Sequence, residues 1–381
     1  MKTYTLLSII FVIFVVIPGC EKAKRGPVTG KSVKIGVIGP MTGSDKAWGE
    51  KGLYGVKTAL KLQPFLDNGS LVEIVVEDDR NQPELARKAL LKLVEDDTIS
   101  SVIIMSASEV VLSLVEMADT LAIPIFAVMS THPDITKNSS FISQLLFDDH
   151  FQASVAALYV RDELLAERVG VIIDEKNPHS EYLARQFDAK FTSTGGICQK
   201  LPLNNDPKKL LAGLEFLQHK KIKFLYVPLD AEHVISIAQI LQQIDYHPLL
   251  VGSDGLQATL LLQHSDNLDL VNGMLATDPY SYTIPPTGYG KTIIRNYQKL
   301  FNTPGTGLAV QGAEGTSIML SAMNRCNKQN DRSCINRMLR STRDFEGMFG
   351  KISIDADGKA ERPILINTIN NGRLIGVVKV Y

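Results

Sequence analysis

The stretch ISSVIIMSASE, residues 99–109, decides the fold once it is compared with IKFLYVPLDAE at residues 222–232. In both places an apolar run, typical of a buried strand, passes through a short polar loop into a helical pattern. Each helix leads to a second apolar run that contains a proline and ends in serine, IPIFAVMS at 123–130 and HPLLVGS at 247–253. The repeated strand–loop–helix–strand pattern predicts two similar α/β lobes within the chain.

The same alternation extends outward from these two units. Residues 33–39 (VKIGVIG) and 72–77 (VEIVVE) are β-branched apolar runs that predict buried strands. Alternating strands and helices favour a mainly parallel sheet covered by helices on both faces. Loops after parallel strands lie at the carboxyl edge of a sheet, where open α/β sheets bind ligands. Two lobes with facing carboxyl edges therefore predict a ligand-binding cleft.

The first residues predict export. A basic start at Lys2 precedes a long apolar run that ends in Ile17-Pro-Gly-Cys20, and this combination is typical of a secretory signal. The end of the run resembles a bacterial lipobox, although Pro18 departs from the usual pattern. We therefore expect a lipoprotein signal peptide at 1–19, lipid on Cys20 and a tether at 20–32. An uncleaved membrane anchor, or a signal whose cysteine has no role, is the alternative. Either interpretation places the remaining chain outside the cytoplasm.

Composition and motifs exclude several classes of function. The 40 basic and 41 acidic residues are interspersed along the chain, so no Lys/Arg stripe predicts a nucleic-acid partner. The sequence contains no GxGxxG, Walker loop, nucleophile elbow, CxxC or HExxH motif. We therefore expect no catalysis, no cofactor and no metal site.

The four cysteines are expected to have different roles. Cys326 and Cys334 flank a short polar loop, and disulfides persist in exported proteins. A Cys326–Cys334 bridge is therefore expected, with two free thiols as the alternative. Cys198 is left over and is expected to be a partly buried apolar side chain.

Several segments, taken in order, resemble one known family. They are residues 33–43 (VKIGVIGPMTG) followed by Trp48, residues 77–79 (EDD), residues 251–255 (VGSDG) and residues 345–350 (FEGMFG). Their order and spacing are similar to those of the branched-chain amino acid binding proteins (Leu/Ile/Val-binding-like), which are type I periplasmic solute-binding proteins of ABC importers. The resemblance implies an α/β fold of two Rossmann-like lobes with parallel-sheet cores, joined by a three-segment hinge.

The resemblance also implies how the chain divides between the lobes. The crossing segments are expected near residues 144–152, 275–282 and 345–365. The N-terminal lobe is expected to comprise residues 33–147 and 279–347. The C-terminal lobe is expected to comprise residues 148–278 and 348–381.

In the family, the ligand carboxylate is bound by hydroxyl and backbone N–H groups that follow a strand. Ser106 and Ser108 hold that position here, although Ser108 could instead only cap its own helix. Ser130 and Thr131 follow the next strand. Thr131 corresponds to a threonine that touches both ends of the ligand backbone, and an ordinary turn before Pro133 is the alternative.

Two further residues complete the expected site. Asp254 corresponds to an acid that pairs with the ligand ammonium, with ordinary Asp-Gly turn chemistry as the alternative. Trp48 corresponds to an aromatic residue that walls the side-chain pocket, unless it only packs over the first helix. The chain departs from the family at Leu229, where an aromatic is usual. It departs again at residues 177–180 (NPHS), where Tyr-Gly is usual and His179 or Tyr182 could substitute.

These features together predict an extracytoplasmic, membrane-anchored solute-binding lipoprotein. It is expected to capture an amino acid or related small carboxylate by hinge closure and to deliver it to an ABC permease. The alternative is a lipid-anchored sensor or interaction protein of the same fold that regulates a partner in the cell envelope.

Overall fold

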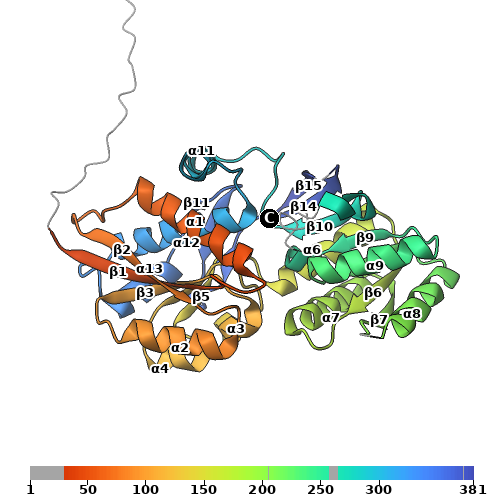
Figure 1. Cartoon of the computed structure of the whole chain (residues 1–381), viewed down its shortest axis with the longest axis horizontal. Coiled ribbons are helices and arrows are strands. Elements are labelled where there is room, and N and C mark those ends of the chain that lie inside the picture. The colour runs from red at the N-terminus through yellow and green to blue at the C-terminus, as the bar shows by residue number, and fades with distance from the viewer. Residues whose placement is uncertain (1–29, 205, 257–264, 372) are drawn as a thin grey trace, which may run out of the picture.

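A computed structural model describes residues 30–204, 206–256, 265–371 and 373–381, which form two α/β lobes lying side by side (Figure 1). The expected signal peptide, Cys20 and all but the last residues of the expected tether lie outside the described residues. Within the described ranges, none of the helices combines the length and the apolar character that a bilayer span requires.

The first lobe is built on a five-stranded sheet in the order β2-β1-β3-β4-β5. All of its strand pairs are parallel. The strands are β1 (Ser32–Gly39), β2 (Leu71–Asp78), β3 (Ile99–Ile104), β4 (Ile125–Ala127) and β5 (Ile142–Gln144). Every residue of β3, β4 and β5 is buried, as expected for parallel strands that are covered by helices on both faces.

Helices cover both faces of this sheet. Successive side chains of a strand point to opposite faces, so Ile35 and Val37 of β1 enter one apolar cluster and Ile38 enters the other. The first cluster is closed by α1 (Lys46–Leu62), α12 (Gly307–Asn324) and α13 (Arg332–Arg340), and the second by α2 (Pro83–Val94), α3 (Ser108–Leu112), α4 (Val115–Thr120) and α5 (Asp134–Lys137).

The helices α1 and α12 touch backbone to backbone. A Cβ atom on Gly55 would lie 1.9 Å from the carbonyl oxygen of Ala309, and one on Gly312 would lie 2.1 Å from that of Gly52. Glycine is required at both positions because any side chain would overlap the facing backbone. This close contact holds α12, which extends to the boundary between the lobes, against the first lobe.

The second lobe is built on a seven-stranded sheet in the order β15-β14-β10-β9-β8-β6-β7. Its parallel part comprises β6 (Arg168–Ile173), β7 (Ile197–Pro202), β8 (Phe224–Val227), β9 (Leu249–Gly252) and β10 (Leu275–Asp278), and its antiparallel edge comprises β14 (Ile364–Asn370) and β15 (Arg373–Val380). One face is covered by α6 (Asp149–Leu158) with its π-helical extension (Tyr159–Glu163) and by α7 (Pro178–Ser193), and the other by α8 (Pro207–His219), α9 (Ala231–Gln243) and the 3₁₀ segment Ser265–Val271. The predicted α/β fold class with parallel-sheet cores is confirmed.

The chain crosses between the lobes three times: after β5, after β10, and between β13 and β14. After the second crossing come α11 (Gly288–Phe301), α12 and α13, and then a small sheet of β11 (Phe345–Glu346), β12 (Lys351–Ile354) and β13 (Ala360–Glu361). This sheet differs from the expected division, which put residues 348–361 in the second lobe. Ile352, Ile354 and Ala360 belong to the core of the first lobe, because the alternate residues of β12 are apolar and pack there.

A disulfide joins Cys326, just after α12, to Cys334 in α13. Cys198 is free and half-buried. A bridge that closes so short a loop stabilises the fold by about 2–3 kcal/mol in the chain-entropy model.

A buried ion pair ties the crossing segments to α12. Arg362, between β13 and β14, donates from Nη1 to Oε2 of Glu314 at 2.9 Å and to the carbonyl oxygen of Leu145 at 3.5 Å. Oε1 of Glu314 accepts from the backbone N–H of Met348 at 2.5 Å. The two charged side chains are 3% and 0% exposed. Arg362 therefore joins the first and third crossings to a helix of the first lobe.

Replacement Arg362→Met should lower the free energy of unfolding by about 3–5 kcal/mol, because the carboxylate of Glu314 would remain buried without its partner. Urea denaturation followed by circular dichroism measures the loss. The matched control is Arg185→Met, whose pair with Glu181 is exposed and should contribute no more than about 1 kcal/mol. Equal losses in the two variants would show that the buried pair does not stabilise the crossings.

Candidate functional site

A cavity of about 260 Å³ lies between the lobes, where strands of both sheets end. Its first-lobe wall includes Trp48, Ser108 and Thr131, which follow β1, β3 and β4. Its second-lobe wall includes His179, Leu229 and Asp254, which follow β6, β8 and β9, and Asp278 ends β10. The cavity therefore occupies the place at which facing carboxyl edges predict a ligand site.

Ser106 and Ser130 lie inside the first lobe and do not line the cavity. The hydroxyl of Ser106 donates to Oδ2 of Asp79, and the hydroxyl of Ser130 donates to the carbonyl oxygen of Ser106 at 2.7 Å. Both hydroxyls hold neighbouring strand ends together. Their placement differs from the expected ligand contact, because each points back between the strands instead of outward.

Ser108 and Thr131 do reach the cavity. Oγ of Ser108 accepts from the backbone N–H groups of Thr131 and His132, both at 3.3 Å. Ser108 is the first residue of α3, whose N-cap position is Ala107. Among the described residues its hydroxyl donates to no acceptor, so its hydrogen remains available. Oγ1 of Thr131 lies 3.4 Å from Nδ1 of His179 in the other lobe. These two residues therefore combine a hydroxyl donor with a contact across the cleft.

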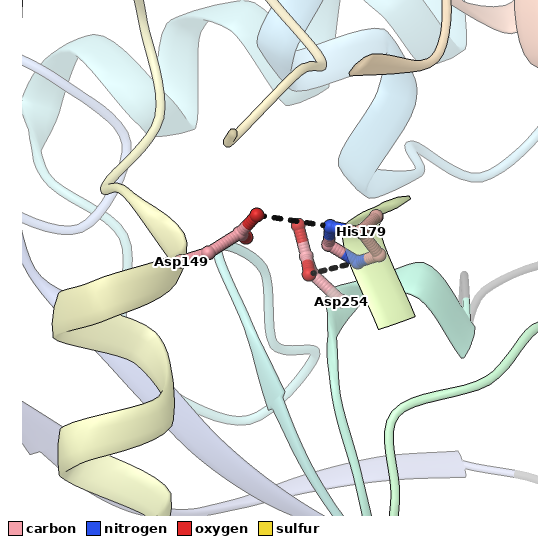
Figure 2. Close-up of side chains that lie close together, drawn as sticks. All are labelled: Asp149, His179 and Asp254. Carbon is pink, nitrogen blue, oxygen red and sulfur yellow. Dashed lines mark hydrogen bonds and ion pairs between the residues drawn. The ribbon is translucent and has the colours of Figure 1, made fainter. Parts of the chain in front are cut away.

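His179 lies between two carboxylates (Figure 2). Its Nδ1 is 3.2 Å from Oδ2 of Asp149, and its Nε2 is 3.6 Å from Oδ1 of Asp254. Asp149 begins α6 and is fully buried, and its backbone N–H donates to the carbonyl oxygen of Thr131 at 3.0 Å. The side chain of Asn177 caps α7 by accepting from the backbone N–H of His179, which sets the start of that helix.

The two carboxylates keep the imidazole charged. Burial alone would lower the pKa of His179, but the charge and the hydrogen bond of Asp149, together with the charge of Asp254, raise it to about 9. His179 is therefore an imidazolium at neutral pH. The nitrogen and oxygen atoms of the three side chains lie close enough to hold a metal ion. Each ring nitrogen faces its own carboxylate, however, and this is the geometry of an ion-paired array.

Gln152 fixes Asp254 in place. Its amide Nε2 donates to Oδ1 of Asp254 at 2.7 Å, and its Oε1 accepts from the backbone N–H of Asp254 at 2.9 Å and from the hydroxyl of Thr277 at 2.6 Å. The carboxylate that lines the cavity is thus oriented by α6, β10 and the turn Asp254–Leu256 together.

Asp278 and Gln311 line the cavity at the boundary between the lobes. They are 6% and 7% exposed. Oδ1 of Asp278 accepts from the backbone N–H of Tyr280 at 2.7 Å, and Oε1 of Gln311 has no hydrogen-bond partner within the described part of the chain. Trp48 packs against the core of the first lobe while lining the cavity, and its Nε1 also has no hydrogen-bond partner in the residues that the structure describes.

Comparison with known proteins decides the family. The family model described as periplasmic binding protein matches residues 32–373. The chain belongs to this family of periplasmic binding proteins.

The binding protein is similar over nearly its whole length to several relatives. The Leu/Ile/Val-binding protein BraC3 of Rhizobium johnstonii is 22% identical over 339 residues, which cover 87% of this chain and 90% of that protein. The solved structure of the leucine-binding protein LivK of Thermotoga maritima matches with a TM-score of 0.84 and 26% identity, over 91% and 98% of the two chains. A solute-binding protein of Rhodopseudomonas palustris, solved with 3,4-dihydroxybenzoic acid, matches with a TM-score of 0.79 and 19% identity, over 92% and 97%. The predicted resemblance to branched-chain amino acid binding proteins is confirmed.

Sequence reasoning missed four residues of the binding protein's cleft or its support. They are Asp149, Gln152, Asp278 and Gln311. An acidic residue at the end of an apolar strand can be recognised in the sequence as a candidate ligand contact, and Asp278 at the end of β10 is such a residue. The other three begin or lie within helices, and nothing in the periodicity of α6 or α12 marks them.

The ion-paired array predicts a pH dependence. Because the folded-state pKa of His179 is raised from 6.5 to about 9, its stabilisation of the binding protein is fully present below pH 6.5. It is lost as the pH rises through about 9. The difference in free energy of unfolding between the unmodified protein and His179→Gln should therefore shrink from pH 6 to pH 9.5.

Urea denaturation at four pH values across this range measures that difference. The matched control is His219→Gln, which removes an exposed imidazole at the end of α8. A His179→Gln difference that stays constant between pH 6 and 9.5 would mean that the two carboxylates do not hold the proton.

Proposed function

We propose that this binding protein captures an amino acid or related small molecule outside the cytoplasm and delivers it to an ABC permease. The observation that carries the proposal is the cavity itself, to which both lobes contribute polar groups at the ends of their strands. Thr131 and Ser108 offer hydroxyls from one side, and Asp254 offers a carboxylate from the other. The similar proteins BraC3, a Leu/Ile/Val-binding protein, and LivK, a leucine-binding protein, support an amino acid as the ligand.

A zwitterion fits the distribution of charge in the cleft. The carboxylate of an amino acid can accept from the hydroxyls of Ser108 and Thr131 beside the imidazolium of His179. Its ammonium can donate to Asp254, which Gln152 holds in a fixed orientation. A charge-assisted hydrogen bond contributes about 1.5–3 kcal/mol, so a few such bonds reach the roughly −8 kcal/mol of micromolar binding.

Closure of the lobes provides the mechanism. A ligand held by Thr131 on one lobe and Asp254 on the other makes its full set of contacts only when the lobes are closed. It therefore shifts the equilibrium between open and closed states. The three crossings are the segments that would bend.

Ligand binding is tested by thermal unfolding of the purified protein with a panel of amino acids, amides and aromatic acids. At least one should raise the melting temperature, because ligand at about 100 times its Kd stabilises the fold by about 2.7 kcal/mol. Thr131→Ala and Asp254→Asn should abolish the shift. The control Thr192→Ala, which changes an exposed residue of α7, should keep it.

If no small molecule in the panel shifts the melting temperature, capture of a solute is the wrong function. A lipid-anchored sensor or interaction protein that regulates an envelope partner then becomes the better account.

We also propose that Cys20 carries the lipid that anchors the protein to a membrane, as the lipobox-like residues before it indicate. Replacement Cys20→Ser should move the expressed protein from the membrane fraction to the soluble fraction, measured by ultracentrifugation and immunoblotting. Retention of the variant in the membrane fraction at the level of the unmodified protein would contradict lipidation.

A further inference from the structure

One buried carboxyl group in the cleft has no use in the binding of a simple zwitterion. Asp278 is 6% exposed and lines the cavity, and the only hydrogen bond it makes among the described residues is the one that Oδ1 accepts from Tyr280. Burial raises the pKa of this carboxyl group to about 8; the charge of Asp254 adds to the rise, while the Tyr280 hydrogen bond and Arg362 oppose it. A carboxylate in this place is costly unless a positive group binds it.

Among the described residues, no positively charged side chain pairs with Asp278. Arg362 is already hydrogen-bonded to Glu314, and His179 is engaged by Asp149 and Asp254. No Lys or Arg from the described part of the chain lines the cavity, whereas five acidic residues do: Asp45, Glu109, Asp230, Asp254 and Asp278. His179 is the one cationic side chain among the described lining residues, so acidic groups outnumber basic groups in the cleft, and this balance favours a ligand with an excess of positive charge.

A second, independent observation concerns another residue that lines the cavity. Gln311 is 7% exposed and lines the cavity, and its Oε1 has no hydrogen-bond partner among the residues described. It lies one helical turn after Gly307, on the same face of α12, and a Cβ atom on Gly307 would be 3.8 Å from Oδ1 of Asp278. Both side chains line the cavity, and among the described residues neither Oδ2 of Asp278 nor Oε1 of Gln311 has a hydrogen-bond partner.

An amino acid with an apolar side chain cannot satisfy these acceptors. Its ammonium pairs with Asp254, and its apolar side chain would leave Asp278 and the Gln311 oxygen without donors in a closed cleft. Leaving a buried polar group unsatisfied is unfavourable. A ligand whose far end carries N–H donors would satisfy both.

We propose that the ligand is a basic amino acid or a similar amine, whose second, distal ammonium or guanidinium group is bound by Asp278 and Gln311. This inference rests on the proposed function, since it specifies the solute that the same cleft would capture. Asp254 remains the partner of the first ammonium, and Asp278 determines specificity for the second.

Isothermal titration calorimetry of the purified protein with lysine, arginine, leucine, glutamate and benzoate tests the inference. Lysine or arginine should bind at least about tenfold more tightly than leucine, which corresponds to about one charge-assisted hydrogen bond. Asp278→Asn should weaken binding of the basic ligand by about tenfold or more and leave any binding of leucine within about threefold. The control Asp245→Asn, in an exposed turn between α9 and β9, should change neither affinity.

Gln311→Met provides a second variant of similar size, should Asp278→Asn fail to fold. It removes the acceptor, so it should weaken the basic ligand and spare leucine. Thermal unfolding without ligand verifies that each variant is folded.

The outcomes separate the two proposals. Tight binding of leucine with weaker binding of lysine and arginine, unchanged in Asp278→Asn, overturns the inference while the proposed function stands. Preferential binding of glutamate or benzoate also overturns it, because Asp278 would then act as a protonated donor to an anion. Binding of no compound in either panel overturns the proposed function.

Discussion

The direction of the strands is the constraint on which the rest of this structure depends. Parallel strands bring all their carboxyl ends to one edge of a sheet, and each lobe has such an edge. Residues that are far apart in the sequence, such as Thr131 and Asp254, therefore meet at a single cavity. The three crossings keep the two edges opposite each other, and the buried pair of Arg362 with Glu314 ties two of those crossings to α12.

The buried acidic side chains differ in whether the protein itself provides a positively charged partner. Glu314 has Arg362 as its partner, and Asp149 has His179, so these charges are compensated within the protein. Asp278 has no such partner among the described residues. Because an unpaired charge in a low-dielectric site is unfavourable, the residue that lacks a partner is the informative one for the ligand.

The fold could be predicted from the sequence, whereas the site could be predicted only in part. The two repeated strand–loop–helix units in the sequence predicted two lobes with parallel-strand sheets. They could do so because a strand that is buried on both faces appears in the sequence as an apolar run. Five expected residues line the cavity, namely Trp48, Ser108, Thr131, His179 and Asp254. Ser106 and Ser130 do not, because neighbouring residues at a strand end point in different directions. The pairing of Asp149 with His179 depends on how α6 meets α7, and no local pattern records that contact.

Whether the cleft holds a small molecule is tested most directly by mass spectrometry of the purified protein after exposure to an extract of cellular metabolites. The ligand released on denaturation should be a single amine-bearing compound, present in about one equivalent per chain, and absent from Thr131→Ala treated in the same way. Release of no compound in stoichiometric amount from the unmodified protein would contradict the assignment of this cleft as a solute-binding site.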